Sequence, residues 1–287
     1  MKVAGIDVGS KYVHVYLMEI AKSKVDYVIE QIHDPDTPTP KGLLKYAMPA
    51  ATNISATVER TFEEALKQAK LQRNDFERIW ATGINRKEVL FANHFIPDAI
   101  ANTHGVLLKV RNAKTILDVG EIGCRVIRIS REGKVLDIAI SDNGTVGMGS
   151  FNEFAAKALG LTLPEMSESS LKSASAIFSN GRYKTFGESE VVSLIKQKLS
   201  NNDIARAVYD AIAARIAKVA QITGLEDDVA IVGGMAKNSG FVAALKHTIG
   251  KDIKEPHNPD FVCSFGAAVA AAAGEVDEEV RRKNHKY

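Results

Sequence analysis

The amino-acid sequence predicts an α/β protein made of two similar domains with a ligand-binding cleft between them. The same strand-ending pattern, Asp-x-Gly, occurs in "GIDVGS" at 5–10 and again in "TILDVG" at 115–120. Each copy is followed by further strand-like runs, then by helical spacing and another strand, which indicates an internal duplication. The chain has 287 residues, enough for two domains that each bury a core. A cleft between two such domains is a common place for a small ligand.

Alternation and helical spacing predict the elements of the first half. Val13, Val15 and Leu17 alternate with His14 and Tyr16, as in a half-buried strand. Three prolines and a glycine after the third run indicate a loop. In order, we expect strands at 3–9, 12–20 and 24–32, a loop at 33–42, a helix at 56–71, a strand at 76–84 and a helix at 97–110.

The pattern restarts after Ala113. "REGK" at 131–134 indicates a hairpin, and Gly224 is a suitable C-cap for a long helix. We expect strands at 115–120, 124–130 and 135–140, helices at 150–160, 188–200 and 203–224, a strand at 228–234, a further helix ending near Ile249, and a last helix with an alanine-rich face. These patterns place a first domain at 1–113 and a second at 114–263, with a C-terminal helix at 264–283 joined to the first.

Composition and charge exclude several classes of protein. The formal net charge is only +2, so no basic field indicates a nucleic-acid partner. The longest apolar run, 265–274, is too short to span a bilayer, and no leader segment precedes the first strand, so we expect no membrane association. Two cysteines, Cys124 and Cys263, are too few for a disulfide framework, which favours the cytoplasm.

The Asp-x-Gly turns suit the binding of a nucleotide with its metal ion. Asp7 and Asp118 would hold Mg²⁺, usually through water, because hard cations prefer oxygen ligands. Gly9 and Gly120 would let a backbone N–H come close to a phosphate without a Cβ in the way. Further candidates for nucleotide binding are Ser10 and Lys11 in the first turn, and Gly233, Gly234 and Asn238 in a third glycine turn that would admit the adenosine. The Rossmann and P-loop patterns are absent.

These motifs resemble those of the acetate kinase, sugar kinase, Hsp70 and actin superfamily of ATP-binding proteins, and within it the BadF/BadG/BcrA/BcrD ATPases. That group holds the activators of 2-hydroxyacyl-CoA dehydratases and the ATPase subunits of benzoyl-CoA reductase. The resemblance extends over nearly the whole chain and includes "ATGINR" at 81–86, "FGESEVVS" at 186–193 and "VGGMAKNSG" at 232–240. It implies duplicated actin-like (ribonuclease H-like) domains, an interdomain nucleotide cleft, ATP or ADP with Mg²⁺, and a role for Glu188 at the hinge or nucleotide site.

The sequence departs from the activators where they bind iron and sulfur. In the activators, two cysteines from each subunit of a dimer hold one [4Fe–4S] cluster, and ATP hydrolysis drives an electron into a partner enzyme. Here the corresponding positions are Gly144 and about Tyr183, and Cys124 and Cys263 lie elsewhere in the sequence. Two cysteines per chain in a dimer would supply the four thiolates that such a cluster needs. Because neither cysteine lies at a position that the activators use, we interpret both as buried or partly buried structural cysteines and expect no iron–sulfur cluster.

A second departure concerns hydrolysis. The activators carry "DIGGQD", whose Gln and Asp lie near the γ-phosphate, whereas this chain has "DVGEIG". Glu121 is the ionisable residue left there, and it either orients water as a base or points to solvent. We therefore expect an ATP-binding, slowly hydrolysing protein without the cluster, with a partner enzyme or a homodimer as its context.

Two other functions stay open. The chain is a small-molecule kinase if Asp98, at the start of the helix at 97–110, takes a proton from a sugar hydroxyl that attacks the γ-phosphate. It is a non-hydrolysing nucleotide-binding scaffold if Glu121 has no catalytic role.

Overall fold

The computed structural model describes residues 1–20, 41–141, 147–173 and 186–274. It divides into two compact units, Met1–Arg111 with the chain from Cys263 onwards, and Asn112–Val262. The strand expected at 24–32, the positions Gly144 and Tyr183, and the C-terminal helix beyond Gly274 lie outside the described residues.

The first unit is built on a five-stranded mixed sheet with the order β3-β2-β1-β4-β5. The central strand β1 is antiparallel to β2 and parallel to β4, and most of its residues are buried. The strands are β1 (Lys2–Val8), β2 (Tyr12–Glu19), β3 (Lys41–Pro49), β4 (Arg78–Thr82) and β5 (His94–Phe95). Strand β3 is a correction, because Lys41 and Gly42 were expected in the loop at 33–42 and no strand was predicted after it.

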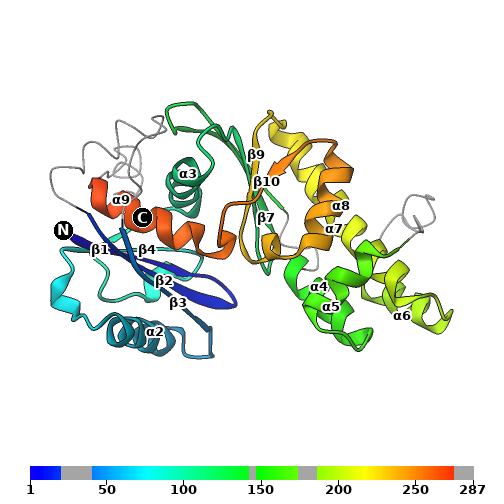
Figure 1. Ribbon diagram of the computed structural model, residues 1–287, viewed down its shortest axis with the longest axis horizontal. Helices are drawn as coiled ribbons and strands as arrows, with labels where there is room; N and C mark the ends of the chain where they lie inside the picture. The colour runs from blue at the N-terminus through cyan, green and yellow to red at the C-terminus, as the bar shows by residue number, and fades with distance from the viewer. Residues whose placement is uncertain (21–40, 142–146, 174–185, 275–287) are drawn as a thin grey trace. The chain divides into compact units, whose positions relative to one another are not determined.

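Helices cover both faces of this sheet (Figure 1). Helix α2 (Ile54–Ala69) places Val58 and Phe62 against one face. Helix α9 (Val262–Ala273), which comes from the far end of the sequence, packs with α3 (Asp98–Lys109) in the core of the other face. Gly5 lets α9 approach β1 closely, since a Cβ there would collide with the main chain at Ser264 and Ala268. Two short 3₁₀ helices, η2 (Arg73–Asp75) and η3 (Arg86–Glu88), flank β4 in the chain.

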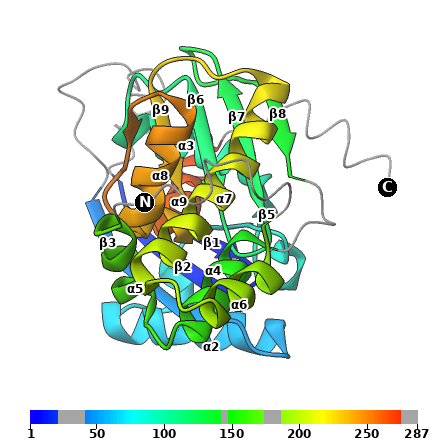
Figure 2. The same ribbon diagram turned by 90° about the vertical axis from the view of Figure 1, so that its right-hand side faces the viewer.

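The second unit repeats the sheet, with the order β10-β9-β6-β7-β8. Figure 2 shows β9, β6, β7 and β8 side by side, with β8 at one edge. The strands are β6 (Thr115–Val119), β7 (Cys124–Ile129), β8 (Val135–Ile140), β9 (Val229–Val232) and β10 (Ile253–Lys254). The prediction of an α/β protein with a duplicated sheet is confirmed.

Five α-helices belong to the second unit among the residues described. They are α4 (Met148–Ala158), α5 (Leu163–Leu171), α6 (Glu188–Lys196), α7 (Asn201–Thr223) and α8 (Ser239–Ile249), with the 3₁₀ helices η5 (Gly234–Lys237) and η6 (Pro259–Phe261). Helix α7 ends as predicted at Gly224, which has a φ of 75°. Helix α5 was not predicted, although Thr162 and Glu165 form a capping box at its start.

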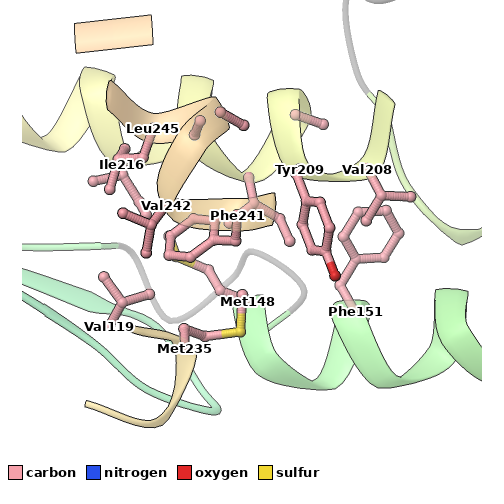
Figure 3. Packing of buried hydrophobic residues seen from close by; sticks show 14 of the residues in the cluster. Val119, Met148, Phe151, Val208, Tyr209, Ile216, Met235, Phe241, Val242 and Leu245 are labelled. Atoms are coloured by element: carbon pink, nitrogen blue, oxygen red, sulfur yellow. The ribbon is translucent and has the colours of Figure 1, made fainter. Parts of the chain in front are cut away.

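The core of this unit joins α7 and α8 to the sheet. Figure 3 shows Tyr209 of α7 beside Phe241 of α8, with ring centroids 6.4 Å apart. Both side chains are fully buried, as are Phe151 and Ile216 nearby. The core therefore fixes the start of α8, which directly follows the third glycine turn. None of the described helices is long and apolar enough to cross a membrane.

Candidate functional site

The two Asp-x-Gly turns have the same backbone geometry. In the first hairpin the Gly9 N–H donates to Tyr12 O at 3.0 Å, and in the second the Gly120 N–H donates to Gly123 O at 3.0 Å. Each hairpin therefore closes around a two-residue loop, Ser10–Lys11 or Glu121–Ile122. The glycine amides are already engaged, so a phosphate at either turn would have to be met by another amide of the loop.

The strand registers around the two carboxylates also correspond. Asp7 lies opposite His14 in the hairpin, and Asp118 lies opposite Arg125. On its other side, each aspartate pairs with the last residue of a parallel neighbour, which is Thr82 of β4 for Asp7. For Asp118 it is Val232 of β9. The pattern of strand pairing is thus the same, position by position, around both aspartates, although the paired residues differ.

A glycine follows each parallel neighbour and packs against the aspartate. Gly83 and Gly233 have φ values of 93° and 92°, a conformation that favours glycine. A Cβ on Gly83 would lie 2.5 Å from Asp7 Oδ1 and 2.5 Å from Val8 O. A Cβ on Gly233 would lie 3.1 Å from Asp118 Oδ1 and would collide with Val119 O. Gly83 is therefore the counterpart of Gly233, and no sequence pattern had indicated it as a site residue.

The first turn is held by Asn85, from the loop that begins at Gly83. The Asn85 N–H donates to Val8 O at 3.0 Å, and the side-chain Nδ2 donates to Gly9 O at 3.2 Å. These bonds tie the two residues that follow Asp7 to the loop after β4. The segment "ATGINR" contained this signal, but only the pairing of β4 with β1 reveals what Asn85 contacts.

The second turn is held by the start of α4. The carbonyl of Glu121 accepts hydrogen bonds from the Gly149 N–H at 3.0 Å and the Ser150 N–H at 3.4 Å. The Glu121 carboxylate lies at the same helix start, because a Cβ on Gly149 would be 2.5 Å from Glu121 Oε2. A carboxylate is stabilised there by the helix dipole. Glu121, the candidate base, is therefore a neighbour of α4 and is only partly exposed.

Asp118 is paired with a cation in its own hairpin. The Arg125 Nη1 lies 3.1 Å from Asp118 Oδ2, and the Asp118 side chain is only 14% exposed. The equivalent position in the first hairpin holds His14. The two candidate metal ligands thus have different electrostatic surroundings.

Asp98 lies near the first turn. It is the first residue of α3, and its Oδ1 is 3.9 Å from Arg86 Nη1, which also donates to Gly83 O at 3.1 Å. The Cys263 thiol lies 4.0 Å from the Asp98 carbonyl and 4.0 Å from Thr82 Oγ1. The first unit therefore gathers Asp7 and Asp98 around the residues that follow β4.

Asn238 performs a structural task beside the third glycine turn. Its Oδ1 accepts the Phe241 N–H as the N-cap of α8, and its Nδ2 donates to the Tyr209 hydroxyl at 2.6 Å. Burial raises the pKa of Tyr209 to about 12, in spite of the hydrogen bond from Asn238. Gly234 is different, since a Cβ there would meet nothing within 4 Å. Open space therefore lies beside Gly234.

Glu188 is not brought to either turn. It begins α6 and is exposed, and no hydrogen bond or ion pair of the described residues joins it to the turns. In the same first helical turn, Glu190 Oε2 accepts the Gly187 N–H at 2.7 Å, which lowers the pKa of Glu190. The Arg215 guanidinium donates to Phe186 O just before α6.

Comparison with known proteins gives a consistent result over nearly the whole chain. The sequence profile of the BadF/BadG/BcrA/BcrD ATPase family matches residues 4–271. The activator of lactoyl-CoA dehydratase of Anaerotignum propionicum is 30% identical over 217 residues, which cover 76% of this chain and 84% of the activator.

Two solved structures share the fold. The activator of the 2-hydroxyisocaproyl-CoA dehydratase from Clostridium difficile, with bound ADPNP, superposes with a TM-score of 0.81 at 22% identity, covering 100% of this chain and 98% of the activator. Component A of the (R)-2-hydroxyglutaryl-CoA dehydratase of Acidaminococcus fermentans gives a TM-score of 0.82 at 23% identity, and the match covers 96% of this chain and 100% of component A. The predicted actin-like fold is confirmed by these matches.

Proposed function

The chain belongs to the BadF/BadG/BcrA/BcrD ATPase family, and from this premise we propose that it binds Mg-ATP through its two Asp-x-Gly turns and hydrolyses it slowly. The observation that carries the proposal is the matched geometry at Asp7 and Asp118. Each carboxylate lies at the end of the central strand of its sheet, against a positive-φ glycine of the parallel neighbour. The ADPNP-containing structure of a protein with the same fold supports the choice of nucleotide.

The donor atoms at Asp7 fit a magnesium ion. A carboxylate oxygen at a strand end is a hard ligand of the kind Mg²⁺ prefers, and Asp7 is partly exposed. Bound Mg²⁺ would neutralise charge on the phosphates of ATP. Around it, Ser10 and Lys11 would contact phosphate from the first loop, while Gly9 closes that loop. Gly120 closes the second loop in the same way.

We assign the adenosine to the third glycine turn. Gly233 is held in its left-handed conformation against Val119, and open space lies beside Gly234. Asn238 would act on the nucleotide by fixing the end of this turn, since both of its polar atoms have partners within the protein. The role that we propose for Glu188 at the hinge or nucleotide site rests on the family resemblance alone, since Glu188 is exposed at the start of α6.

The physiological context that we propose is the activation of a partner enzyme, by this chain alone or as a homodimer. The supporting relatives are activators of 2-hydroxyacyl-CoA dehydratases. The activators of that group are expected to hold an iron–sulfur cluster, whereas we propose that this protein has none. The Cys124 thiol is buried in the hydrophobic core of the second unit, which leaves it no exposed face for a cluster.

A kinase is the second candidate, and the position of Asp98 favours it. Asp98 is joined through Arg86 and Gly83 to the surroundings of Asp7, so a hydroxyl beside Asp98 would be near the phosphates that we assign to the first turn. A general base there would take the proton of an acceptor alcohol.

Calorimetric titration with Mg-ATP tests nucleotide binding. Asp7→Asn and Asp118→Asn should each weaken binding by about 10- to 100-fold, the usual cost of losing an outer-shell partner of a metal ion. Asp227→Asn is the matched control, because Asp227 is 84% exposed and belongs to a surface ion pair with Lys251. Unchanged affinity in both turn variants would disprove the two-turn site.

Phosphate release separates hydrolysis from phosphoryl transfer. If Glu121 orients the attacking water, Glu121→Gln should lower hydrolysis by about 10²- to 10⁴-fold at unchanged ATP affinity, and Asp98→Asn should have no effect. A kinase would show the reverse pattern, with turnover that rises on addition of a sugar acceptor and is lost in Asp98→Asn. If the wild type turns over no ATP with any acceptor, the protein is a non-hydrolysing scaffold.

Anaerobic reconstitution with iron and sulfide tests the absence of a cluster. The protein should stay colourless. A stoichiometric cluster that disappears in Cys124→Ser or Cys263→Ser would overturn this part of the proposal and assign the thiols as ligands.

A further inference from the structure

Asn85 connects two segments that are far apart in the sequence but adjacent in the first sheet. Its main-chain N–H binds Val8 O at 3.0 Å, and its side-chain Nδ2 binds Gly9 O at 3.2 Å. Val8 and Gly9 are the two residues directly after Asp7. Asn85 thus links the backbone after the candidate metal ligand to the loop after β4, while the far side of the first phosphate loop is held by the Ala50 N–H, which donates to Lys11 O at 2.7 Å.

The neighbouring contacts restrict the same backbone from another side. Gly83 packs against Asp7 Oδ1 and Val8 O, and the Arg86 guanidinium holds Gly83 O at 3.1 Å. Asn85 therefore extends from a loop that is itself fixed to the end of β4. The first hairpin cannot shift away from β4 at its loop without breaking the bond from Asn85 Nδ2.

The second unit has no residue of this kind among those described. There the chain after Gly233 continues into η5, and the second turn is held by α4 through the carbonyl of Glu121. Among the described residues, the side-chain bond of Asn85 thus has no counterpart at the second turn. The duplicated fold does not require it, so it needs an explanation within the first unit.

We propose that Asn85 is a positioning residue for the first phosphate turn, which sets the direction of the Ser10 and Lys11 amides toward bound nucleotide. The nucleotide part of this inference rests on the proposed function. The Asn85 side chain would act through Gly9 and would not itself touch the phosphates. Its loss would make the loop mobile and weaken Mg-ATP binding without unfolding the sheet, because the main-chain bond to Val8 remains in any variant.

The test compares Asn85→Asp, which keeps the shape but removes the donor, with Asn85→Gln, which keeps an amide donor. Amide hydrogen exchange of peptides that cover 8–12 should be about 3- to 10-fold faster in Asn85→Asp, the effect of one hydrogen bond. The affinity for Mg-ATP should fall by a similar factor, and Asn85→Gln should recover part of both losses.

Asn93→Ala is the matched control. Asn93 Oδ1 accepts the Ile79 N–H at 2.6 Å, so this variant also removes a side chain-to-backbone bond at β4, but away from the turn. Exchange at 8–12 should stay unchanged in it.

Two results would overturn the inference. One is unchanged exchange at 8–12 in Asn85→Asp, and the other is faster exchange with unchanged affinity. If the wild type itself fails to bind Mg-ATP, the proposed function fails, while the exchange data still decide whether Asn85 holds the turn.

Discussion

In the first unit the Asp-x-Gly turn is held by the side chain of Asn85, whereas in the second unit it is held by the first amides of α4. The backbone of the two turns, their registers and the glycines that face them are nevertheless the same. Main-chain geometry has thus been kept in both copies while the supporting contacts diverged. The turn geometry is therefore the feature that the two units share, and the contacts that support it differ between them.

The charged residues near Asp7 and Asp118 also differ between the two units. Asp118 is paired with Arg125 across its hairpin, and the first loop carries Lys11 where the second carries Ile122. A cation is therefore present beside each turn, but at the base of one hairpin and in the loop of the other. We expect the two turns to contribute unequally to phosphate and metal binding.

The largest loss of stability should come from replacing Asn238, the asparagine that follows the glycine turn in the second unit. Asn238→Ala removes the cap of α8 and leaves the buried Tyr209 hydroxyl without its partner, at a combined cost of about 2–4 kcal/mol in unfolding free energy. Asn85→Ala, in the first unit, should cost about 1 kcal/mol or less, because Asn85 is only partly buried. Urea denaturation followed by circular dichroism measures both. Equal losses would mean that Asn85 has a structural role of the same weight as Asn238.

The facing glycines come next. Gly83→Ala and Gly233→Ala each force a side chain into a left-handed conformation, which should lower the free energy of unfolding by about 1–3 kcal/mol. The single tryptophan, Trp80, is buried in the first unit and should report Gly83→Ala by fluorescence, while circular dichroism reports Gly233→Ala. Gly234→Ala is the matched control, since it meets no atom within 4 Å and should leave stability unchanged. A stable Gly83→Ala variant would show that the two loops are not equivalent.

A smaller effect is expected at the Asp118–Arg125 pair. Arg125→Met should cost about 1 kcal/mol in stability, because the pair is partly solvated, and the cost should shrink in high salt. Arg128 is on the same strand, and its pair with Glu226 is longer, at 3.9 Å, so Arg128→Met controls for the loss of an arginine. A loss of stability in Arg125→Met that does not change with salt would indicate that Arg125 stabilises the unit by packing and not by its charge.

The smallest effect at neutral pH should be at Cys124, which occupies the register position of Val13 in the first hairpin. Cys124→Val should change stability by less than about 1 kcal/mol, since a buried free cysteine behaves as a small apolar residue. Burial raises the pKa of Cys124 from 9.0 to about 11, so the neutral thiol is favoured in the folded state. Its stabilising contribution is therefore complete below pH 9 and is lost as the pH rises from 9 to 11.

Two measurements check these statements. Thiol titration at pH 8 should find Cys263 reactive in the native protein and Cys124 reactive only in denaturant. The decline of stability between pH 9 and 11 should be smaller in Cys124→Val. A native Cys124 that reacts at pH 8 would contradict the burial of this hairpin.

The comparison also shows which features sequence patterns can predict. The two turns were predictable because a hairpin with Asp-x-Gly is a local signal, and Gly224 ended α7 for a local reason. Gly83 and Asn85 were not, because their contacts depend on the parallel pairing of β4 with β1, which no short pattern encodes. Asn238 was assigned to the nucleotide, although an asparagine before a helix is also a common N-cap.

Other differences have equally specific causes. Strand β3 was missed because prolines and Gly42 surround its beginning, where turn signals outweigh β-propensity. Glu121 was considered as a base or a solvated residue, and its contact with α4 depends on the approach of Gly149, 28 positions later in the numbering. The sequence places a carboxylate in the loop, but tertiary contacts determine its neighbours.

The return of α9 to the first sheet has a consequence for biosynthesis. The strands of the first unit leave the ribosome before the second unit, but one face of their sheet is covered by a helix that begins at Val262. Until that helix is made, Val3 and Trp80 lack the partners that bury them in the finished protein. Residues 112–262 form a continuous unit and can complete their core first. We therefore expect the second unit to fold before α9 covers the sheet of the first. This order is the reverse of the usual one, in which the N-terminal domain folds first during synthesis.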